Sequence, residues 1–452
     1  MDAASAGAIL LRTMGEEMRT ILALIAGVAL APPVVAQEAV TLTIASVDNP
    51  DMIRMQALSE EFTAANPGIA LEWVLMEEGL LRRTVGTDIA LGGGRFDVLT
   101  LGTYEVPIWG ARGWLRPLDD LPRDYGVEDL LPSIRDGLSV EGVLYALPFY
   151  GESSFTMVRT DLLHEAGLEL PEAPTWDEVR LAAQAMHRPE KGVYGICLRG
   201  KPGWGENMAL IGVMANSLGA RWFDEDWRPQ FDTPEWRATM ALYLELMALG
   251  PPGAEANGFN ENLRLFEEGR CALWVDATVA ASFVTDPDVS TVVGQVGFAL
   301  APDAGLGKRA NWLWSWALAV PASTDAPEAA EAFAAWATSR GYTDLVASRE
   351  GWAAVPPGTR RSLYENPDYL AAAPFARLTL RSIEAADPTD PAVDPVPYTG
   401  VQIVSIPEFQ GLGDAVGREF ALALTGEKTG EAALSDAQTI AVQQMTAAGY
   451  LD

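Results

Sequence analysis

The most distinctive side chains in this sequence are three tryptophans at alternate positions. Trp312, Trp314 and Trp316 lie in the segment ANWLWSWALAVP, residues 310–321. In a strand they would share one face, and each flat indole could cover about 150–250 Å² of a neighbouring surface, including the C–H face of a hydroxylated molecule. For Trp312 and Trp314, the sequence is compatible with either of two roles, lining a ligand cleft or packing in the core. Trp316 leads into the apolar run ALAV and is expected to pack in the core.

Polar side chains in the predicted loops could bind uncharged hydroxyl groups. A hydroxyl both donates and accepts, so carboxylates, amides and phenols can together satisfy it. Two acidic residues in these loops also have purely structural interpretations. Asp48 could cap the following helix, and Glu105 could be a solvated surface group. The candidate binding residues are Asp48, Asn49, Tyr104, Tyr150, Glu152, Ser153, Trp204, Glu206, Asn207, Asp276, Thr278, Trp312, Trp314, Tyr398 and Gln402.

The elements that must position these side chains alternate between strands and helices. Apolar patterning predicts strands over 40–46, 69–75 and 96–101, with helices over 52–65 and 80–91 between them. This order implies a parallel sheet with helices on its faces. The alternation resumes later, with strands over 193–198 and 271–276 and helices over 181–186, 236–249, 328–339, 413–424 and 430–448.

Catalytic and cofactor motifs are sparse. The chain has two histidines, His164 and His187, which leaves little for a histidine-based zinc site or a nucleophile–histidine pair. GESSF lacks the last glycine of a nucleophile elbow, and GLGKRA lacks the hydroxyl residue of a phosphate loop. We therefore expect no enzyme activity, no cofactor and no metal site. Carboxylates are plentiful, so a secreted carbohydrate-active enzyme stays as the rival hypothesis.

The balance of charge is strongly acidic. The 62 acidic and 31 basic residues give a formal net charge of −31. Such a surface repels nucleic-acid phosphates and anionic membranes. It suits a soluble protein, which we expect to be a monomer.

The N-terminal region resembles an export signal. Residues 18–36, MRTILALIAGVALAPPVVA, combine a basic start, a short apolar run and a small-residue cleavage site. We predict a signal peptide over 1–36 with the true start at Met18, and a periplasmic mature chain. In that oxidising compartment Cys197 and Cys271 could pair, but both lie in apolar segments where free cysteine is also common.

Several segments, in this order, resemble the extracellular solute-binding proteins of ABC importers, in the branch that includes maltose-binding protein. Among them are TIASVDNP, EFTAANPGIALEW, VLYALPFYGESSFTMVRTDLL, LFEEGRCALWVD and WALAVPASTDAPEAAEAFAAWATS. Three further segments, LRGKPGWGENM, NWLWSWALAVPA and YTGVQIVSIPEFQ, look like the sorbitol/mannitol-binding members.

The resemblance implies a periplasmic-binding-protein-like α/β fold, with two discontinuous lobes joined by hinge strands around a ligand cleft. The crossovers are expected near 150–155, 300–302 and 353–357. Residues 37–153 plus 300–356 would form the N-terminal lobe, and 154–299 plus 357–452 the C-terminal lobe. In open α/β sheets, ligands bind beyond the carboxyl ends of the strands, where the candidate residues lie.

The implied function is binding of a sugar alcohol of the sorbitol or mannitol type by interlobe closure, followed by delivery to the transmembrane permease. A monosaccharide, an oligosaccharide or another solute is the alternative ligand. The sequence does not rank the individual polyols.

Overall fold

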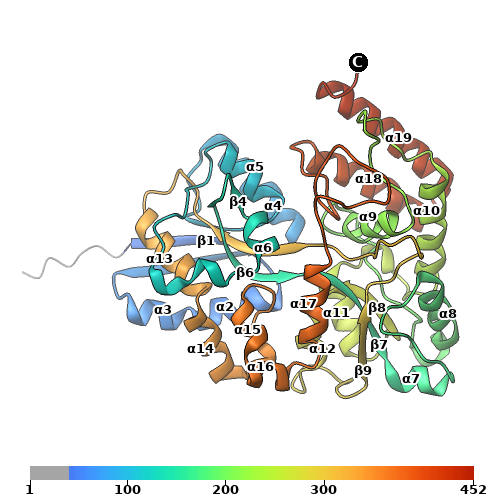
Figure 1. The fold of residues 1–452 in the computed structure, drawn as a ribbon, viewed down its shortest axis with the longest axis horizontal. Helices are drawn as coiled ribbons and strands as arrows, with labels where there is room; N and C mark the ends of the chain where they lie inside the picture. The colour runs from blue at the N-terminus through green and yellow to red at the C-terminus, as the bar shows by residue number, and fades with distance from the viewer. Residues whose placement is uncertain (1–39) are drawn as a thin grey trace, which may run out of the picture. The chain divides into compact units, whose positions relative to one another are not determined.

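The strands of this protein form two main sheets that meet where β6 runs into β7. The computed structural model describes residues 40–452 (Figure 1). The first sheet has the order β2-β1-β3-β10-β6 and the second the order β8-β7-β9. In the order of the sheets, the strands are β2 (Ile69–Met76), β1 (Val40–Val47), β3 (Val98–Gly102), β10 (Trp314–Ala319) and β6 (Leu147–Glu152), then β8 (Leu273–Ala277), β7 (Ser154–Arg159) and β9 (Val296–Leu300), with a short hairpin of β4 (Ser139–Val140) and β5 (Val143–Leu144).

The predicted parallel arrangement is confirmed for the beginning of the chain but not for the rest. β1 pairs in parallel with β2 and β3, whereas β10 is antiparallel to β3 and β6. β7 is antiparallel to both β8 and β9. β7 continues from β6 after the single residue Ser153, so it enters the second sheet directly from the first and not through a helical crossover.

Helices cover both sheets and account for most of the remaining chain. In the first half they are α2 (Pro50–Leu58), α3 (Glu60–Ala65), α4 (Glu78–Leu91), α5 (Glu105–Ala111), α6 (Pro132–Gly137), α7 (Thr160–Glu165), α8 (Trp176–Met186), α9 (Asn207–Ser217) and α10 (Pro234–Met247). In the second half they are α11 (Phe259–Glu267), α12 (Ala280–Val284), α13 (Pro327–Ala337), α14 (Arg340–Glu350), α15 (Arg361–Glu365), α16 (Pro367–Ala372), α17 (Ala376–Glu384), α18 (Phe409–Leu424) and α19 (Gly430–Ala447).

Two predicted elements differ in detail. The helix expected over 52–65 is divided at Ser59 into α2 and α3. The prediction of a strand over 193–198 is wrong. This segment makes only single bridges to the β8 region, from Tyr194 to Cys271 and from Cys197 to Trp274. Between them, Gly195 packs so close to the backbone of Ala183 that a Cβ would be 2.3 Å from its carbonyl oxygen, and its N–H donates to the Leu249 carbonyl.

Each sheet carries its own set of packed helices, and we call these parts the first lobe (five-stranded sheet) and the second lobe (three-stranded sheet). Residues of β6, β7, β8 and β10 are buried throughout. In the second lobe, α18 and α19 pack beside α9 and α10 (Figure 1). The residue boundaries expected for the lobes stay a prediction.

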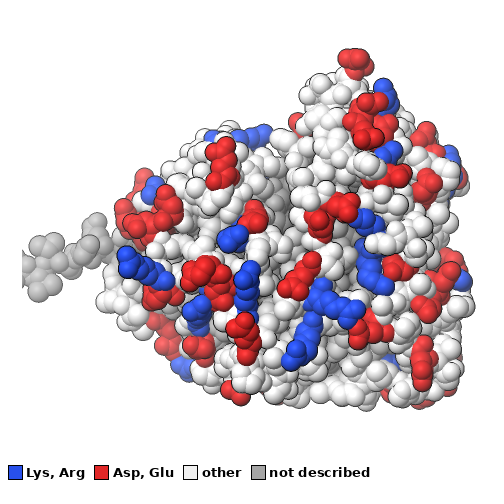
Figure 2. All heavy atoms as spheres, viewed as in Figure 1, with Lys and Arg blue, Asp and Glu red and all other residues white. Residues whose placement is uncertain are grey.

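The surface of the described residues carries many acidic groups. Asp and Glu side chains are spread over the face shown in Figure 2, with Lys and Arg between them. No helix within residues 40–452 is both long enough and apolar enough to cross a membrane. The predicted signal peptide, 1–36, lies outside the described residues.

Candidate functional site

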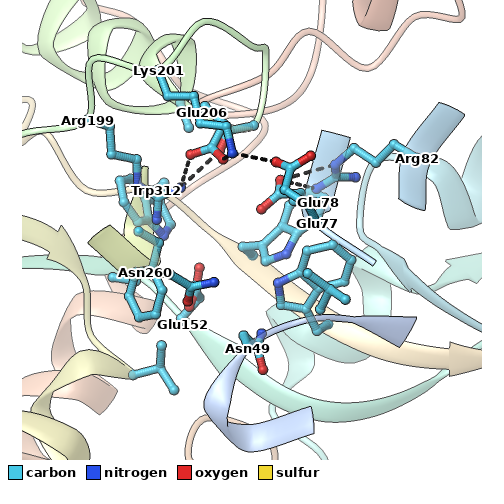
Figure 3. Close-up of a pocket in the computed structure, with 18 of the residues that line it drawn as sticks. Asn49, Glu77, Glu78, Arg82, Glu152, Arg199, Lys201, Glu206, Asn260 and Trp312 are labelled. Carbon is cyan, nitrogen blue, oxygen red and sulfur yellow. Dashed lines mark hydrogen bonds and ion pairs between the residues drawn. The ribbon is translucent and has the colours of Figure 1, made fainter. Parts of the chain in front are cut away.

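A cavity lies between the two lobes, at the ends of strands from both sheets. Its volume is about 90 Å³, room for several water molecules or a small solute. The first lobe contributes Val47, Asp48, Asn49, Glu77, Glu78, Arg82, Tyr150, Glu152, Trp312, Trp314 and Trp316, and the second contributes Arg199, Lys201, Trp204, Gly205, Glu206, Ala209, Phe259, Asn260, Glu261, Ala277, Val279 and Gln402 (Figure 3).

Four tryptophans lie in the cavity wall. Trp314 and Trp316 point to the same face of β10, and their ring centroids are 5.5 Å apart. Trp204, from the second lobe, lies 5.8 Å from Trp314. Trp316 was expected to pack only in the core, but it lines the cavity together with Trp312 and Trp314. The alternation of β10 explains this, because side chains two positions apart share a face.

Three buried polar atoms in the cavity wall have no hydrogen-bond partner among residues 40–452. They are Trp204 Nε1, Trp312 Nε1 and Glu206 Oε2, of which the last lies 3.8 Å from Arg199 Nη1 as a longer ion pair. A buried polar atom without a partner costs about 1–3 kcal/mol. A bound molecule with hydroxyl groups could donate to the carboxylate oxygen and accept from both indole N–H groups.

Three predicted residues line the cavity but already bond within the protein. Asn49 caps α2 by accepting from the Met52 N–H, and its amide donates to the Tyr150 hydroxyl at 3.1 Å. The capping role considered for Asp48 therefore belongs to Asn49. Gln402 accepts from the Leu313 N–H and donates to the Leu313 carbonyl, so this amide positions the segment that carries Trp312.

Glu152 is the most deeply placed carboxyl group of the cavity. Its side chain is buried, and burial raises its pKa to about 8, while the negative charges of Asp276 and Glu78 act in the same direction and Arg199 opposes them. A protonated carboxyl can both donate and accept a hydrogen bond, which suits a neutral hydroxylated ligand.

Arginine side chains from both lobes line the cavity and pack against its tryptophan rings. Arg82 donates to Glu78 at 2.8 Å and to Glu105, and its guanidinium carbon lies 4.0 Å from the Trp204 ring centroid. Glu105 is thus buried and paired, not a solvated surface group. Arg199 binds Asp276, with its Nη2 2.6 Å from Oδ1, and lies 5.3 Å from the Trp312 ring centroid.

Six of the predicted binding residues do not line the cavity, and most of these side chains have partners within the protein. Asp276 is the counter-ion of Arg199. Tyr104 donates to the Ile406 carbonyl at 2.9 Å, and Tyr398 accepts from the Trp222 N–H. The Asn207 amide donates to the Gly417 carbonyl. Thr278 Oγ1 accepts from the N–H of Ser153, and both residues are fully buried where β7 and β8 pair.

The remaining predicted residues, Asp48, Asn49, Tyr150, Glu152, Trp204, Glu206, Trp312, Trp314 and Gln402, meet at the cavity. Sequence reasoning missed Glu77, Glu78, Arg82, Arg199, Lys201, Phe259, Asn260 and Glu261, as well as Trp316. Two of the missed residues, Arg199 and Lys201, belong to the loop RGKPGWGEN, from which the neighbouring Trp204 and Glu206 were selected.

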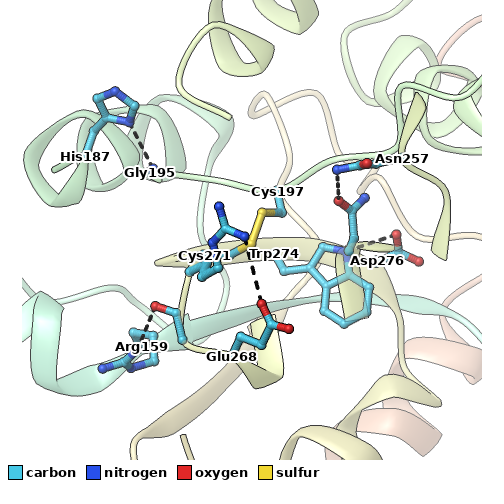
Figure 4. The surroundings of a disulfide bond; sticks show 12 residues. Arg159, His187, Gly195, Cys197, Asn257, Glu268, Cys271, Trp274 and Asp276 are labelled. Atoms are coloured by element: carbon cyan, nitrogen blue, oxygen red, sulfur yellow. Dashed lines mark hydrogen bonds and ion pairs between the residues drawn. A yellow bond between two sulfur atoms is a disulfide. The ribbon is translucent and has the colours of Figure 1, made fainter. Parts of the chain in front are cut away.

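A disulfide bond anchors this loop. Cys197 and Cys271 are joined, with their Cα atoms 5.7 Å apart, so the pairing that the sequence left open is formed (Figure 4). The bond ties the residues just before Arg199 to the segment that leads into β8. Cross-linking residues 74 positions apart restricts the unfolded chain. It also holds Arg199 near Asp276 on that strand.

A family comparison decides what kind of protein carries this cavity. The model of the bacterial extracellular solute-binding protein family matches residues 49–344. The chain belongs to this family. Members of this solute-binding family are binding proteins and not enzymes, and they work outside the cytoplasm. Within residues 40–452, no group of His, Cys, Asp and Glu side chains is arranged to hold a metal ion.

Individual relatives extend the similarity over almost the whole chain. This solute-binding protein is 57% identical to the mannitol-binding protein of Pseudomonas aeruginosa, over 95% of this chain and 99% of the relative. It is 61% identical to an ABC transporter solute-binding protein from Agrobacterium vitis S4, solved with bound D-mannitol, with a TM-score of 0.90 over 91% of this chain and 99% of that one. A ribitol complex of the solute-binding protein from Agrobacterium radiobacter K84 is 26% identical, with a TM-score of 0.79 over 90% and 99%. The fold is therefore periplasmic-binding-protein-like, with two α/β lobes, as predicted.

Proposed function

We propose that this protein is the periplasmic substrate-binding component of an ABC importer and that it binds a sugar alcohol of the mannitol or sorbitol type. The observation that carries this proposal is the 61% identity and 0.90 TM-score to a structure with bound D-mannitol. The cavity supports it, because indole faces and unpartnered polar atoms lie side by side in its wall.

The chemistry of the wall matches an uncharged polyol. The basic groups Arg82, Arg199 and Lys201 are all paired with carboxylates, so a charged ligand would have to compete with these pairs. Carbon-bound hydrogens of a polyol can lie on the tryptophan rings. Its hydroxyl groups can bond to Trp204 Nε1, Trp312 Nε1, Glu206 and Glu152.

Binding is proposed to proceed by closure of the two lobes. Residues 37–153 plus 300–356 would move against 154–299 plus 357–452 about the crossover segments, and closure would bury the solute. The solute shifts this equilibrium only by its preference for the closed form. The closed protein, a monomer exported by a cleavable signal peptide over 1–36, would then deliver the unaltered solute to the transmembrane permease.

Isothermal titration calorimetry tests the proposal. D-mannitol, D-sorbitol, D-arabitol, xylitol and ribitol are titrated separately, with D-glucose, D-fructose and maltose as comparison ligands. We expect saturable one-to-one binding of at least one hexitol and weaker binding of the sugars. Preferential binding of a sugar, or binding of none of these compounds, would contradict the proposed ligand class. Recovery of unchanged ligand after incubation, checked by chromatography, distinguishes binding from turnover.

A further inference from the structure

Carboxylates from both lobes crowd one side of the cavity. Glu77 and Glu78 follow β2 in the first lobe, whereas Glu206 precedes α9 in the second. The two lobes approach closely there. The Gly205 backbone of the second lobe lies so near the Glu78 side chain that a Cβ on Gly205 would be 2.2 Å from Glu78 Oε1. Burial and the negative charge of Glu78 raise the pKa of Glu206 to about 7. Bringing the lobes together therefore places like charges near one another.

Lys201 lies between these acids and pairs with both lobes. Its Nζ is 2.6 Å from Glu77 Oε1 in the first lobe and 3.4 Å from Glu206 Oε1 in its own lobe (Figure 3). Burial alone would lower the pKa of Lys201, but Glu206 and Glu77 raise it above its ordinary value, so the ammonium stays charged. Among the described residues that line the cavity, it is the one lysine.

The nearby basic groups are already engaged. Arg82 is held by Glu78 and Glu105. Arg199 is held by Asp276 at 2.6 Å and is 3.8 Å from Glu206. The pair between Lys201 and Glu77 thus joins an ammonium of the second lobe to a carboxylate of the first, whereas both Arg82 ion pairs stay within the first lobe.

We propose that Lys201 is a positioning residue that makes lobe closure favourable by bridging Glu77 and Glu206, and that its effect on affinity acts through closure. This inference rests on the proposed function, because closure is measured through solute binding. Without the ammonium, closure would oppose Glu77 and Glu78 of the first lobe to Glu206 of the second with no cation bridging the two lobes. With it, Glu77 is attracted to Lys201 of the opposite lobe.

The salt dependence of D-mannitol affinity tests this proposal. D-mannitol is uncharged, so the effect of salt on its dissociation constant reports on the charges of the protein. In the unaltered protein, salt screens an attraction and should weaken binding slightly. In Lys201→Met it screens a repulsion, so binding should be about fivefold weaker at low salt and should strengthen as salt is added.

Matched variants make the result specific. Lys191→Met removes an exposed lysine on the 3₁₀ turn Pro189–Lys191 and should leave both the affinity and its salt slope unchanged. Lys201→Arg keeps the charge and should retain most of the affinity. Glu77→Gln combined with Lys201→Met should bind no more weakly than Lys201→Met alone, because one of the opposed carboxylates is gone.

The outcomes separate this inference from the proposed function. Failure of the unaltered protein to bind D-mannitol or any other alditol would overturn both. Normal binding by the unaltered protein, with a Lys201→Met variant that keeps the same affinity or the same direction of salt dependence, would overturn the role of Lys201 alone. A double variant that binds D-mannitol more weakly than Lys201→Met alone would also overturn it.

Discussion

Asp276 does not face the cavity but holds Arg199, which does. Arg199 Nε donates to both carboxylate oxygens at 3.0 and 3.2 Å, and Nη2 donates to Oδ1 at 2.6 Å. Asp276 is fully buried, and it also accepts from Trp274 Nε1 at 3.1 Å. An acid at the end of a buried strand thus contributes to the site by fixing a neighbouring cation.

Replacement of Asp276 should therefore lower stability before it affects ligand contacts. Asp276→Ala leaves the buried Arg199 charge with only the longer 3.8 Å pair to Glu206, and loss of one partner of a buried pair costs about 3–5 kcal/mol. Urea unfolding in the absence of ligand should show this loss. Asp226→Ala, which breaks the exposed pair with Arg228, is the control and should change the free energy of unfolding by less than about 1 kcal/mol. Equal effects of the two variants would contradict the structural role of Asp276.

Removal of the Trp312 indole nitrogen should weaken binding without unfolding the protein. Trp312 Nε1 meets no partner at full hydrogen-bond geometry among residues 40–452 but lies near the Glu152 carboxyl, so Trp312→Phe should cost little internal bonding and should lose one hydrogen bond to the solute, about 0.5–1.5 kcal/mol of D-mannitol affinity. Trp236→Phe is the matched control, because Trp236 Nε1 donates to the Arg221 carbonyl away from the cavity. Calorimetry should show weaker D-mannitol binding in Trp312→Phe but not in Trp236→Phe. Thermal unfolding should show lower stability in Trp236→Phe but not in Trp312→Phe. Unchanged affinity in Trp312→Phe would show that this nitrogen does not contact the solute.

Gly102 is needed for the position of Trp314. A Cβ at residue 102 would lie 1.8 Å from the six-membered part of the Trp314 ring, so Gly102→Ala must displace the indole or the strand. We expect a loss of about 1–3 kcal/mol in stability from overpacking, together with weaker D-mannitol binding. Gly68→Ala, where no heavy atom lies within 4 Å of the added carbon, should bind normally. Normal binding and stability in Gly102→Ala would contradict the observed packing of Trp314.

With its lobes in contact as in this structure, the protein should show a characteristic pH dependence that comes from Glu152. Its pKa is raised from 4.5 to about 8, so between these values the folded state holds a proton that the unfolded chain has lost. The free energy of unfolding must then fall as the pH rises through this window, and it levels off above pH 8. Glu152→Gln does not bind this proton. The melting temperature of the unaltered protein should therefore fall relative to that of Glu152→Gln as the pH rises from 5 to 8.

The control for this pH series is Glu190→Gln, at an exposed position on a 3₁₀ turn. Its melting temperature should follow that of the unaltered protein at every pH. A Glu152→Gln curve that also runs parallel to it would show that Glu152 titrates normally, and the buried neutral carboxyl would have to be abandoned.

Much of the fold could be predicted because local patterns determined it. Apolar periodicity located β1, β2, α4, α10 and α19 to within a few residues. The reversed direction of β10 and the antiparallel second sheet could not be predicted, since strand direction depends on contacts between distant segments. Gly195 illustrates the same limit, because its close approach to the backbone of Ala183 is not visible in either local sequence.

The site was predictable where a residue type had a distinctive chemistry. Trp204, Trp312 and Trp314 stood out in this way, and the structure brings them together. Arg82 was missed because a basic residue four positions after Glu78 resembles an ordinary pair on a helix surface. Lys201 and Asn260 were missed because their partners, Glu77 and the Asp48 carbonyl, lie in the other lobe.

The most direct test of the central claim is a crystal structure of this protein grown with D-mannitol. The account predicts one mannitol molecule between the lobes, with hydroxyl groups bonded to Trp312 Nε1 and to the carboxyl groups of Glu152 or Glu206, and carbon atoms against Trp204 or Trp314. Mannitol bound at another place, or an empty cavity at saturating mannitol, would contradict it.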